Sequence, residues 1–253
     1  MEMPPIFYEV HSNLPRQGPG DNESTDRAFK SLKNLPRCPR ILDIGCGSGM
    51  QTIELAKLSN GQIEALDSYQ PFLDQLKASV KKEGLNQRIR IVKGDMFNLK
   101  YEKGSFDLIW CEGAIFIIGF ERGLTQWRPL LADNGYLVVS ELSWLRKDVP
   151  QEIQLYMDEM YSGLEDSKAN SVDENIETAK KAGFQVLNSF ILPKKSWFTH
   201  YYSPIEAKLP LLKAKHRDEP DALQFLAGEE KEIEMYRRYS DYYGYAFYVL
   251  QKT

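Results

Sequence analysis

The residues with the clearest chemical potential form a glycine-rich turn that follows a short apolar strand. The segment ILDIGCGSGM, residues 41–50, places Gly45, Gly47 and Gly49 at every second position. Glycine adopts positive φ angles readily, and its lack of a β-carbon lets a ligand approach the backbone. A helix expected from about residue 50 to 58 would point its free N–H groups at whatever lies over the turn. The turn therefore predicts a nucleotide-type binding site.

Two carboxylates follow at equivalent places on the next expected strands. Asp67 ends the strand-like segment 62–67, and Asp95 follows the segment 88–93. Either residue alone is more typical of a helix N-cap than of a ligand-binding group. Open α/β sheets, however, bind their ligands at the carboxyl ends of parallel strands. The shared position of the turn and the two acids favours a binding role.

The order of elements indicates the sheet that must hold these residues. Strands are expected at 41–44, 62–67, 88–93, 106–111 and 136–141, with helices at about 50–58, 71–83 and 120–131 between them. Such alternation is typical of βαβ units. Further helices at 149–162 and 172–182, a strand at 184–192, a charged helical stretch at 204–241 and a last strand at 245–250 follow. We expect an α/β fold, a Rossmann-like seven-stranded mostly parallel sheet with helices on both faces and a helical cap before the last strand.

Composition limits the class of protein. The chain has 253 residues and a net charge of -4, which favours one domain and argues against duplex nucleic acid as a partner. We expect residues 1–36 to form an N-terminal arm or lid, 37–145 the ligand-binding core and 146–253 the substrate-side cap. No apolar run is long enough to span a membrane, and no signal peptide is evident. The three cysteines, Cys38, Cys46 and Cys111, lack metal-site spacing, so no metal is expected and a cytoplasmic location is the default.

The turn departs from the dinucleotide-binding pattern in an informative way. That pattern is G-x-G-x-x-G, whereas the third glycine here comes one residue early and Asp43 precedes the first. The D-x-G-x-G-x-G form resembles motif I of class I S-adenosylmethionine-dependent methyltransferases. The segments FDLIWCEGAIFII and LADNGYLVVSE resemble the fourth- and fifth-strand motifs of the same family.

The resemblance implies a cofactor site at this sheet edge. Asp67 stands where the family binds both ribose hydroxyls, and Asp95 where an acid meets the adenine amino group. Asp43 can face the ammonium group of the cofactor directly or through water. The implied cofactor, S-adenosyl-L-methionine, would contact Gln17, Gly18, Asp43, Gly45, Cys46, Gly47, Gly49, Asp67, Ser68, Gly94, Asp95, Met96 and Glu112. The thiol of Cys46 is expected to serve packing rather than catalysis.

The flanking segments resemble a subgroup of small-molecule methyltransferases from bacteria and archaea. These segments are RQGPG at 16–20, CEGAIFIIGFERG at 111–123 and WFTHYY at 197–202. Gln17 and Gly18 are expected to close over the cofactor, the alternative being a linker. Glu112 and the next two residues replace the Asn/Asp-Pro-Pro-aromatic motif of nucleic-acid and glutamine amino-methyltransferases. This departure disfavours an exocyclic amine of that kind as substrate.

Methyl transfer is an in-line displacement, for which alignment and exclusion of water supply most of the acceleration and some acceptors also need a base. His200 and Glu112 are the candidate catalytic residues, although His200 is as well explained as a structural histidine. Trp144, His200, Tyr201 and Tyr202 are the candidate substrate contacts. His11 is expected to be solvated in a polar arm, and His216 in a charged helix.

The sequence therefore predicts transfer of a methyl group from S-adenosylmethionine to a small-molecule acceptor. One alternative is a nicotinamide-dependent oxidoreductase, and another is a non-catalytic S-adenosylmethionine-binding module. The acceptor is not identified, and a homodimer is left open.

Overall fold

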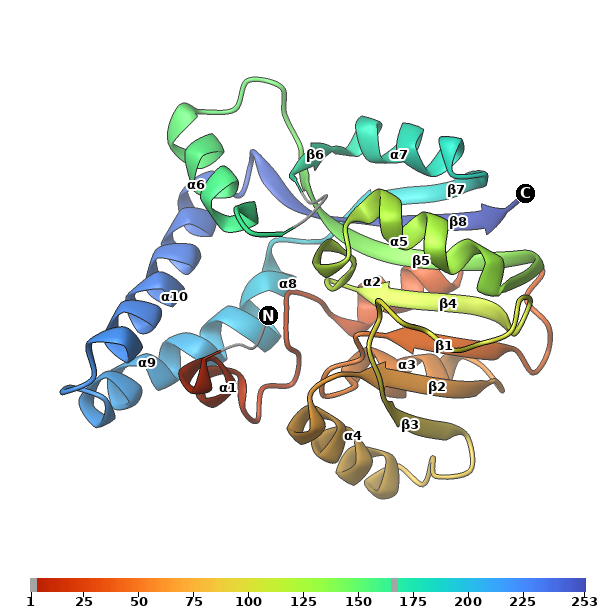
Figure 1. Cartoon of the computed structure of the whole chain (residues 1–253), viewed down its shortest axis with the longest axis horizontal. Coiled ribbons are helices and arrows are strands. Elements are labelled where there is room, and N and C mark those ends of the chain that lie inside the picture. The colour runs from red at the N-terminus through yellow and green to blue at the C-terminus, as the bar shows by residue number, and fades with distance from the viewer. Residues whose placement is uncertain (1–3, 165–167) are drawn as a thin grey trace.

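A single mixed sheet organises the chain, and the computed structural model describes residues 4–164 and 168–253. The strand order is β3-β2-β1-β4-β5-β8-β7 (Figure 1). The strands are β1 (Arg40–Ile44), β2 (Gln62–Asp67), β3 (Ile89–Lys93), β4 (Phe106–Glu112), β5 (Leu131–Trp144), β6 (Asn170–Ser171), β7 (Phe184–Ile191) and β8 (Tyr243–Lys252). Strands β1 to β5 are parallel, and β8 runs antiparallel to β5 and β7. The expected mostly parallel sheet is confirmed, with the two-residue β6 as an eighth strand beside β5.

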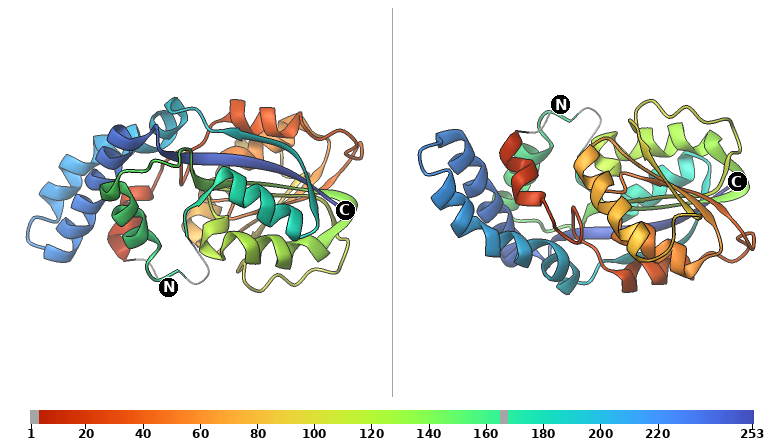
Figure 2. Two further views of the ribbon diagram at one scale, coloured as in Figure 1. Left: turned by 90° about the horizontal axis from the view of Figure 1, so that it is seen from above. Right: turned by 90° about the horizontal axis from the view of Figure 1, so that it is seen from below.

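Helices cover both faces of the sheet (Figure 2). One face packs against α2 (Asn22–Phe29), α3 (Met50–Leu58) and α4 (Gln70–Lys82), and the other against α5 (Phe120–Trp127) and α7 (Val172–Lys181). Helix α7 begins at a capping box, in which Ser171 and Glu174 satisfy each other's backbone N–H groups. The two separate apolar clusters follow from strand residues that alternate between the faces.

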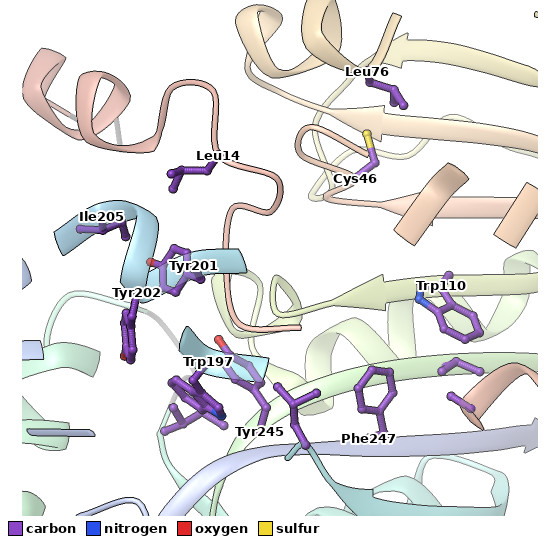
Figure 3. Close-up of a cluster of buried hydrophobic side chains, with 14 of the residues drawn as sticks. Leu14, Cys46, Leu76, Trp110, Trp197, Tyr201, Tyr202, Ile205, Tyr245 and Phe247 are labelled. Carbon is purple, nitrogen blue, oxygen red and sulfur yellow. The ribbon is translucent and has the colours of Figure 1, made fainter. Parts of the chain in front are cut away.

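The remaining helices lie beyond the carboxyl edge of the parallel strands (Figure 1). They are α1 (Pro5–His11), α6 (Gln151–Tyr161), α8 (Lys195–Trp197), α9 (Ser203–Lys215) and α10 (Pro220–Tyr239), with a π-helical turn at Phe198–Tyr202. Trp197 stacks on Tyr236 at 3.9 Å between ring centroids, and its cluster continues through Tyr245 to Phe247 of β8 (Figure 3). The cap and the sheet therefore share one apolar core.

The fifth strand is longer than expected. Its pairing with β8 runs from Tyr136 to Trp144, so the ladder continues three residues beyond the expected end at 141. Residues 133–135 lie inside this strand, where Asn134 has a φ of 59° and the register to β4 shifts. The extension depends on pairing with β8, which lies near the other end of the chain, so the local sequence pattern does not indicate it.

The expectation of a solvated His11 is wrong. Its side chain is 2% exposed, Nδ1 lies 2.8 Å from the carbonyl of Phe7, and Nε2 lies 3.2 Å from the hydroxyl of Tyr201. Burial lowers the pKa of His11 to about 4. Helix α1 of the polar arm therefore has one apolar face, which packs against the cap.

Among the described residues, no helix is both long and apolar enough to cross a membrane.

Gly49, which precedes α3, provides a stability test of the turn. Its φ is 84°, and an added β-carbon would lie 2.1 Å from Cδ1 of Leu76. We expect Gly49→Ala to lower the free energy of unfolding by about 2–4 kcal/mol, through backbone strain and overpacking. Gly228→Ala is the matched control, because its β-carbon would meet open space within α10. It should stabilise by up to about 1 kcal/mol. Urea unfolding of both variants measures the two changes in unfolding free energy. Equal changes would contradict the requirement for glycine at position 49.

The burial of His11 gives a pH test. Because its pKa is lower in the folded state, its contribution to stability is complete above about pH 6.5 and is lost as the pH falls towards 4. In His11→Phe, the unfolding free energy should depend less on pH over this range. Glu9 and Glu219 raise the pKa of His216, so its contribution to stability is instead lost as the pH rises. His216→Asn should therefore not reduce the pH dependence of the unfolding free energy between pH 4 and 6.5. Unfolding measured at half-unit pH intervals separates the two histidines.

Candidate active site

The glycine turn is held against β2 and enclosed from two sides. The N–H groups of Gly45 and Cys46 donate to the carbonyl of Leu66 at 2.8 and 3.0 Å. Gly45 and Gly47 have φ angles of 69° and 53°. A β-carbon on Gly45 would lie 2.6 Å from that of Ala114, and one on Gly47 would lie 2.9 Å from Cγ of Gln17. Only glycine permits this close approach of the turn to the β4 loop and to the arm.

Asp67 is brought to the turn, as expected from its strand end. One carboxylate oxygen accepts the N–H of Gly47 at 2.9 Å, and the other accepts the N–H of Tyr69 at 2.9 Å. Burial raises the pKa of Asp67, while bonds from the N–H groups of Tyr69, Gly47 and Ser68 oppose the rise. The backbone therefore fixes the direction in which this carboxylate can accept further hydrogen bonds.

Asp43 lies beneath the turn and is fully buried. Its Oδ2 accepts the hydroxyl of Thr52 at 2.6 Å, whereas Oδ1 has no hydrogen-bond partner within residues 4–164 and 168–253. Burial raises its pKa to about 7. A buried carboxyl oxygen without a partner is costly, so this position suits a group that brings a donor or a positive charge.

The end of β3 completes this half of the site. Gly94 donates its N–H to the carbonyl of Asp67 at 3.0 Å. Asp95 is exposed and accepts the N–H of Phe97 at 2.9 Å. The Cε of Met96 lies 3.7 Å from the position of a β-carbon on Gly45. Gly94 and Met96, on either side of Asp95 in the sequence, thus adjoin Asp67 and the glycine turn.

The arm reaches the turn through Gln17. Its Nε2 donates to the hydroxyl of Ser48 at 3.2 Å, and its Oε1 is buried without a partner in the described parts of the chain. Ser48 in turn donates to the carbonyl of Pro15 at 3.1 Å. Gly18 is half-buried and has no atom within 4 Å of the place of a β-carbon. Gln17 is thus part of the wall over the turn rather than of a free linker.

Glu112 anchors the arm to the sheet. It accepts Nη1 of Arg16 at 2.6 Å, the hydroxyl of Thr25 at 2.7 Å and Nε1 of Trp110 at 2.8 Å. The side chains of Arg16 and Glu112 are 4% and 3% exposed. With three donors already in place, this carboxylate suits positioning of the arm better than removal of a proton.

The expected acceptor residues differ in burial and in their contacts. His200 is half-buried, and burial together with Arg16 lowers its pKa. Trp144 is also half-buried and meets Tyr243 edge-on. Tyr201 and Tyr202 are buried, one near His11 and the other donating to Glu232 at 2.9 Å. The two tyrosines thus pack the cap.

Two charged residues, Arg16 and Glu141, stand within sequence motifs but were not predicted as site residues. Arg16 belongs to the segment RQGPG, and Glu141 to the fifth-strand motif. A single charge inside the apolar run YLVVSEL is the signal that could have marked Glu141. Cys46 and Cys111 are buried free thiols, and burial raises the pKa of both.

Known proteins share this architecture. Residues 41–135 match the family model described as "Methyltransferase domain". The crystal structure of a SAM-dependent methyltransferase from Geobacter sulfurreducens in complex with S-adenosyl-L-homocysteine aligns with a TM-score of 0.83 and 19% identity, over 100% of this chain and 99% of that one. The corresponding complex from Thiobacillus denitrificans aligns with a TM-score of 0.82 and 21% identity, over 100% of both chains. The fold is that of a class I S-adenosylmethionine-dependent methyltransferase.

Sequence similarity to curated proteins is confined to part of their length. The sterol 24-C-methyltransferase erg6 of Aspergillus fumigatus is 25% identical over 173 residues, which are 66% of this chain and 45% of that protein. The matched region thus spans about half the length of such relatives. The methyltransferase fold, in contrast, extends over the arm and cap, because the solved structures cover the whole chain.

The buried Arg16–Glu112 pair gives a test of how the methyltransferase fold holds its arm. Arg16→Met leaves a buried charge without its partner, which should cost about 3–5 kcal/mol of stability. Arg16→Met with Glu112→Gln should recover part of this loss, because no unpaired charge remains. Glu23→Gln breaks the exposed Lys195–Glu23 bridge and should cost less than about 1 kcal/mol. Urea unfolding and trypsin cleavage of the arm measure all three; equal losses in the single and double variants would refute the role of the charge.

Proposed function

We propose that this protein transfers a methyl group from S-adenosyl-L-methionine to a small-molecule acceptor. The observation that carries the proposal is the bond between the Asp67 carboxylate and the N–H of Gly47. It joins the ribose-binding acid implied by the family resemblance to the glycine turn, at the carboxyl edge of the sheet. Solved structures of this fold that hold S-adenosyl-L-homocysteine support the choice of cofactor.

The residues at the turn fit this cofactor. Asp67 would accept from the ribose hydroxyls, and Asp95 from the adenine amino group. Gly45, Gly47 and Gly49 leave room that a β-carbon would fill. The Oδ1 of Asp43, which has no partner in the described part of the chain, suits the ammonium end. Gln17 and Gly18 would cover the turn, next to Cys46, Ser68, Gly94, Met96 and Glu112. When bound, the cofactor supplies a methyl carbon on a sulfonium, which an acceptor can attack.

The chain itself contributes orientation and exclusion of water. The arm lies over Gly47, and its Tyr8 stacks on Tyr69 with centroids 3.8 Å apart. Alignment of two reactants in an enclosed site supplies a large part of the barrier reduction in such displacements. We assign residues 37–145 to cofactor binding and the arm with 146–253 to enclosure of the acceptor, and we retain Trp144 and His200 as acceptor-side candidates.

The two alternatives draw no support from the comparisons. A nicotinamide-dependent oxidoreductase would bind NAD but not S-adenosyl-L-homocysteine. A non-catalytic module would bind S-adenosylmethionine without turnover on any acceptor. Calorimetry with the three ligands, followed by a mass-shift screen of metabolite pools, separates these cases.

Asp67→Ala tests the placement of the ribose. The variant should bind S-adenosyl-L-homocysteine at least about tenfold more weakly, since one hydrogen bond to a charged acceptor is worth about 1.5–3 kcal/mol. Asp74→Ala removes an exposed acid from α4 and should bind as the wild type does. Calorimetry gives the affinities, and thermal unfolding without ligand shows whether each variant is folded. Wild-type affinity in a folded Asp67→Ala variant would remove the assignment.

A further inference from the structure

A recess lies on the sheet face that carries α5 and α7. It is a cavity of about 440 Å³, within the range of about 300–1,000 Å³ typical of small-molecule sites. Phe116 and Phe120 supply aromatic surface, while Tyr161 of α6 and Asn170 of β6 form part of the wall. Apolar surface with a few polar groups is the usual lining of a ligand site.

Glu141 is the buried acid of this cavity. Its side chain is 3% exposed, and its Oε1 accepts the hydroxyl of Tyr161 at 3.1 Å. Its Oε2 is buried and has no hydrogen-bond partner in the described ranges 4–164 and 168–253. Burial raises the pKa of Glu141 to about 8. A ligand with a positive charge and an N–H donor would offset the cost of burying the carboxylate charge and would give Oε2 a hydrogen-bond partner.

The described lining is acidic on balance. Five of its residues are acidic and two, Lys168 and Lys181, are basic. This excess favours a cation over an anion as the occupant. Within the described residues, no group of three or more His, Cys, Asp or Glu side chains could hold a metal ion. The charge pattern therefore points to an organic cation.

The cavity lies beside the loop that borders the glycine turn. Ser140, which precedes Glu141, accepts the N–H of Gly113 at 2.9 Å. The next residue, Ala114, lies against Gly45. Glu141 and the methyl-donor site thus adjoin the same short loop.

We propose that the methyl acceptor is a small organic amine, and that this cavity binds it in its ammonium form against Glu141. The proposal rests on the proposed methyl transfer. Transfer to such an amine forms a nitrogen–carbon bond as the methyl–sulfur bond breaks, with the electron pair of that bond going to sulfur. The proton that the ammonium must first give up goes to the Glu141 carboxylate.

Two probes of the same shape test the recognition of charge. Benzylamine and benzyl alcohol are titrated calorimetrically into protein saturated with S-adenosyl-L-homocysteine, at a pH where the amine is protonated. We expect benzylamine to bind at least tenfold more tightly than the alcohol. In Glu141→Gln the ratio of the benzylamine affinity to the benzyl alcohol affinity should fall at least tenfold. Glu177→Gln, which removes an exposed acid from the same cavity, should change it less than threefold.

A second variant covers the case in which Glu141→Gln does not fold. Thr178→Trp would fill the cavity from α7 without altering Glu141, and it should abolish benzylamine binding while S-adenosyl-L-homocysteine still binds. Equal binding of amine and alcohol, or an unchanged preference in folded Glu141→Gln, overturns the inference. If the wild type does not bind S-adenosyl-L-homocysteine, that result overturns the proposed function instead.

Transfer itself is tested with methyl-deuterated S-adenosylmethionine and a metabolite extract. Label should enter the untreated extract and should be at least tenfold lower after acetylation of its amines. Equal labelling of both extracts would show a non-amine acceptor and overturn the inference while supporting methyl transfer. Label in neither extract would overturn the transfer on which the inference rests.

Discussion

The buried ion pair between Arg16 and Glu112 is the constraint on which the site depends. Removing two charges from water is expensive, and their attraction repays the cost only when the remaining hydrogen-bonding capacity is used. Here Glu112 also accepts from Thr25 and Trp110, and Arg16 also donates to Thr25 at 3.1 Å, whereas its Nε is buried without a partner in the described residues. The arm, α2 and β4 are therefore fixed to one carboxylate. Residue 17, next in sequence, is thereby placed over the glycine turn.

Other contacts extend this arrangement from the arm to the cap. The hydroxyl of Ser196 donates to Asp21, and the N–H of Gly20 donates to the carbonyl of Ser196 at 3.2 Å. At the other end of the arm, Nζ of Lys208 in α9 donates to the carbonyl of Val10 at 2.8 Å. The arm thus contacts the sheet in its middle and the cap on both sides. Enclosure of the turn is a joint property of three segments that are far apart in the sequence.

Features that depend on local interactions could be predicted from the sequence, whereas features that depend on contacts between distant residues could not. The strands, the glycine turn and the strand-end position of Asp67 depend on short apolar runs and on glycine conformation, which are local. The bond between Glu112 and Arg16 could not be predicted, because the two residues lie 96 positions apart. The burial of His11 depends on Tyr201, 190 residues away. The far end of β5 likewise depends on β8. Hydrogen bonds of this range leave no periodic trace in the sequence.

Asp43 and Glu141 are buried acids near the carboxyl edge of the sheet, and each has one oxygen without a partner among the described residues. Asp43 bonds to Thr52 of α3, whereas Glu141 lines the cavity beside α5 and α7, so they serve opposite faces of the sheet. Burial raises the pKa of both, which means that each carboxyl is more readily protonated than an exposed one. A cation beside either group would favour its ionised form and offset the cost of burial. One physical feature, a desolvated acid, therefore favours a positively charged group at two places along the same edge of the sheet.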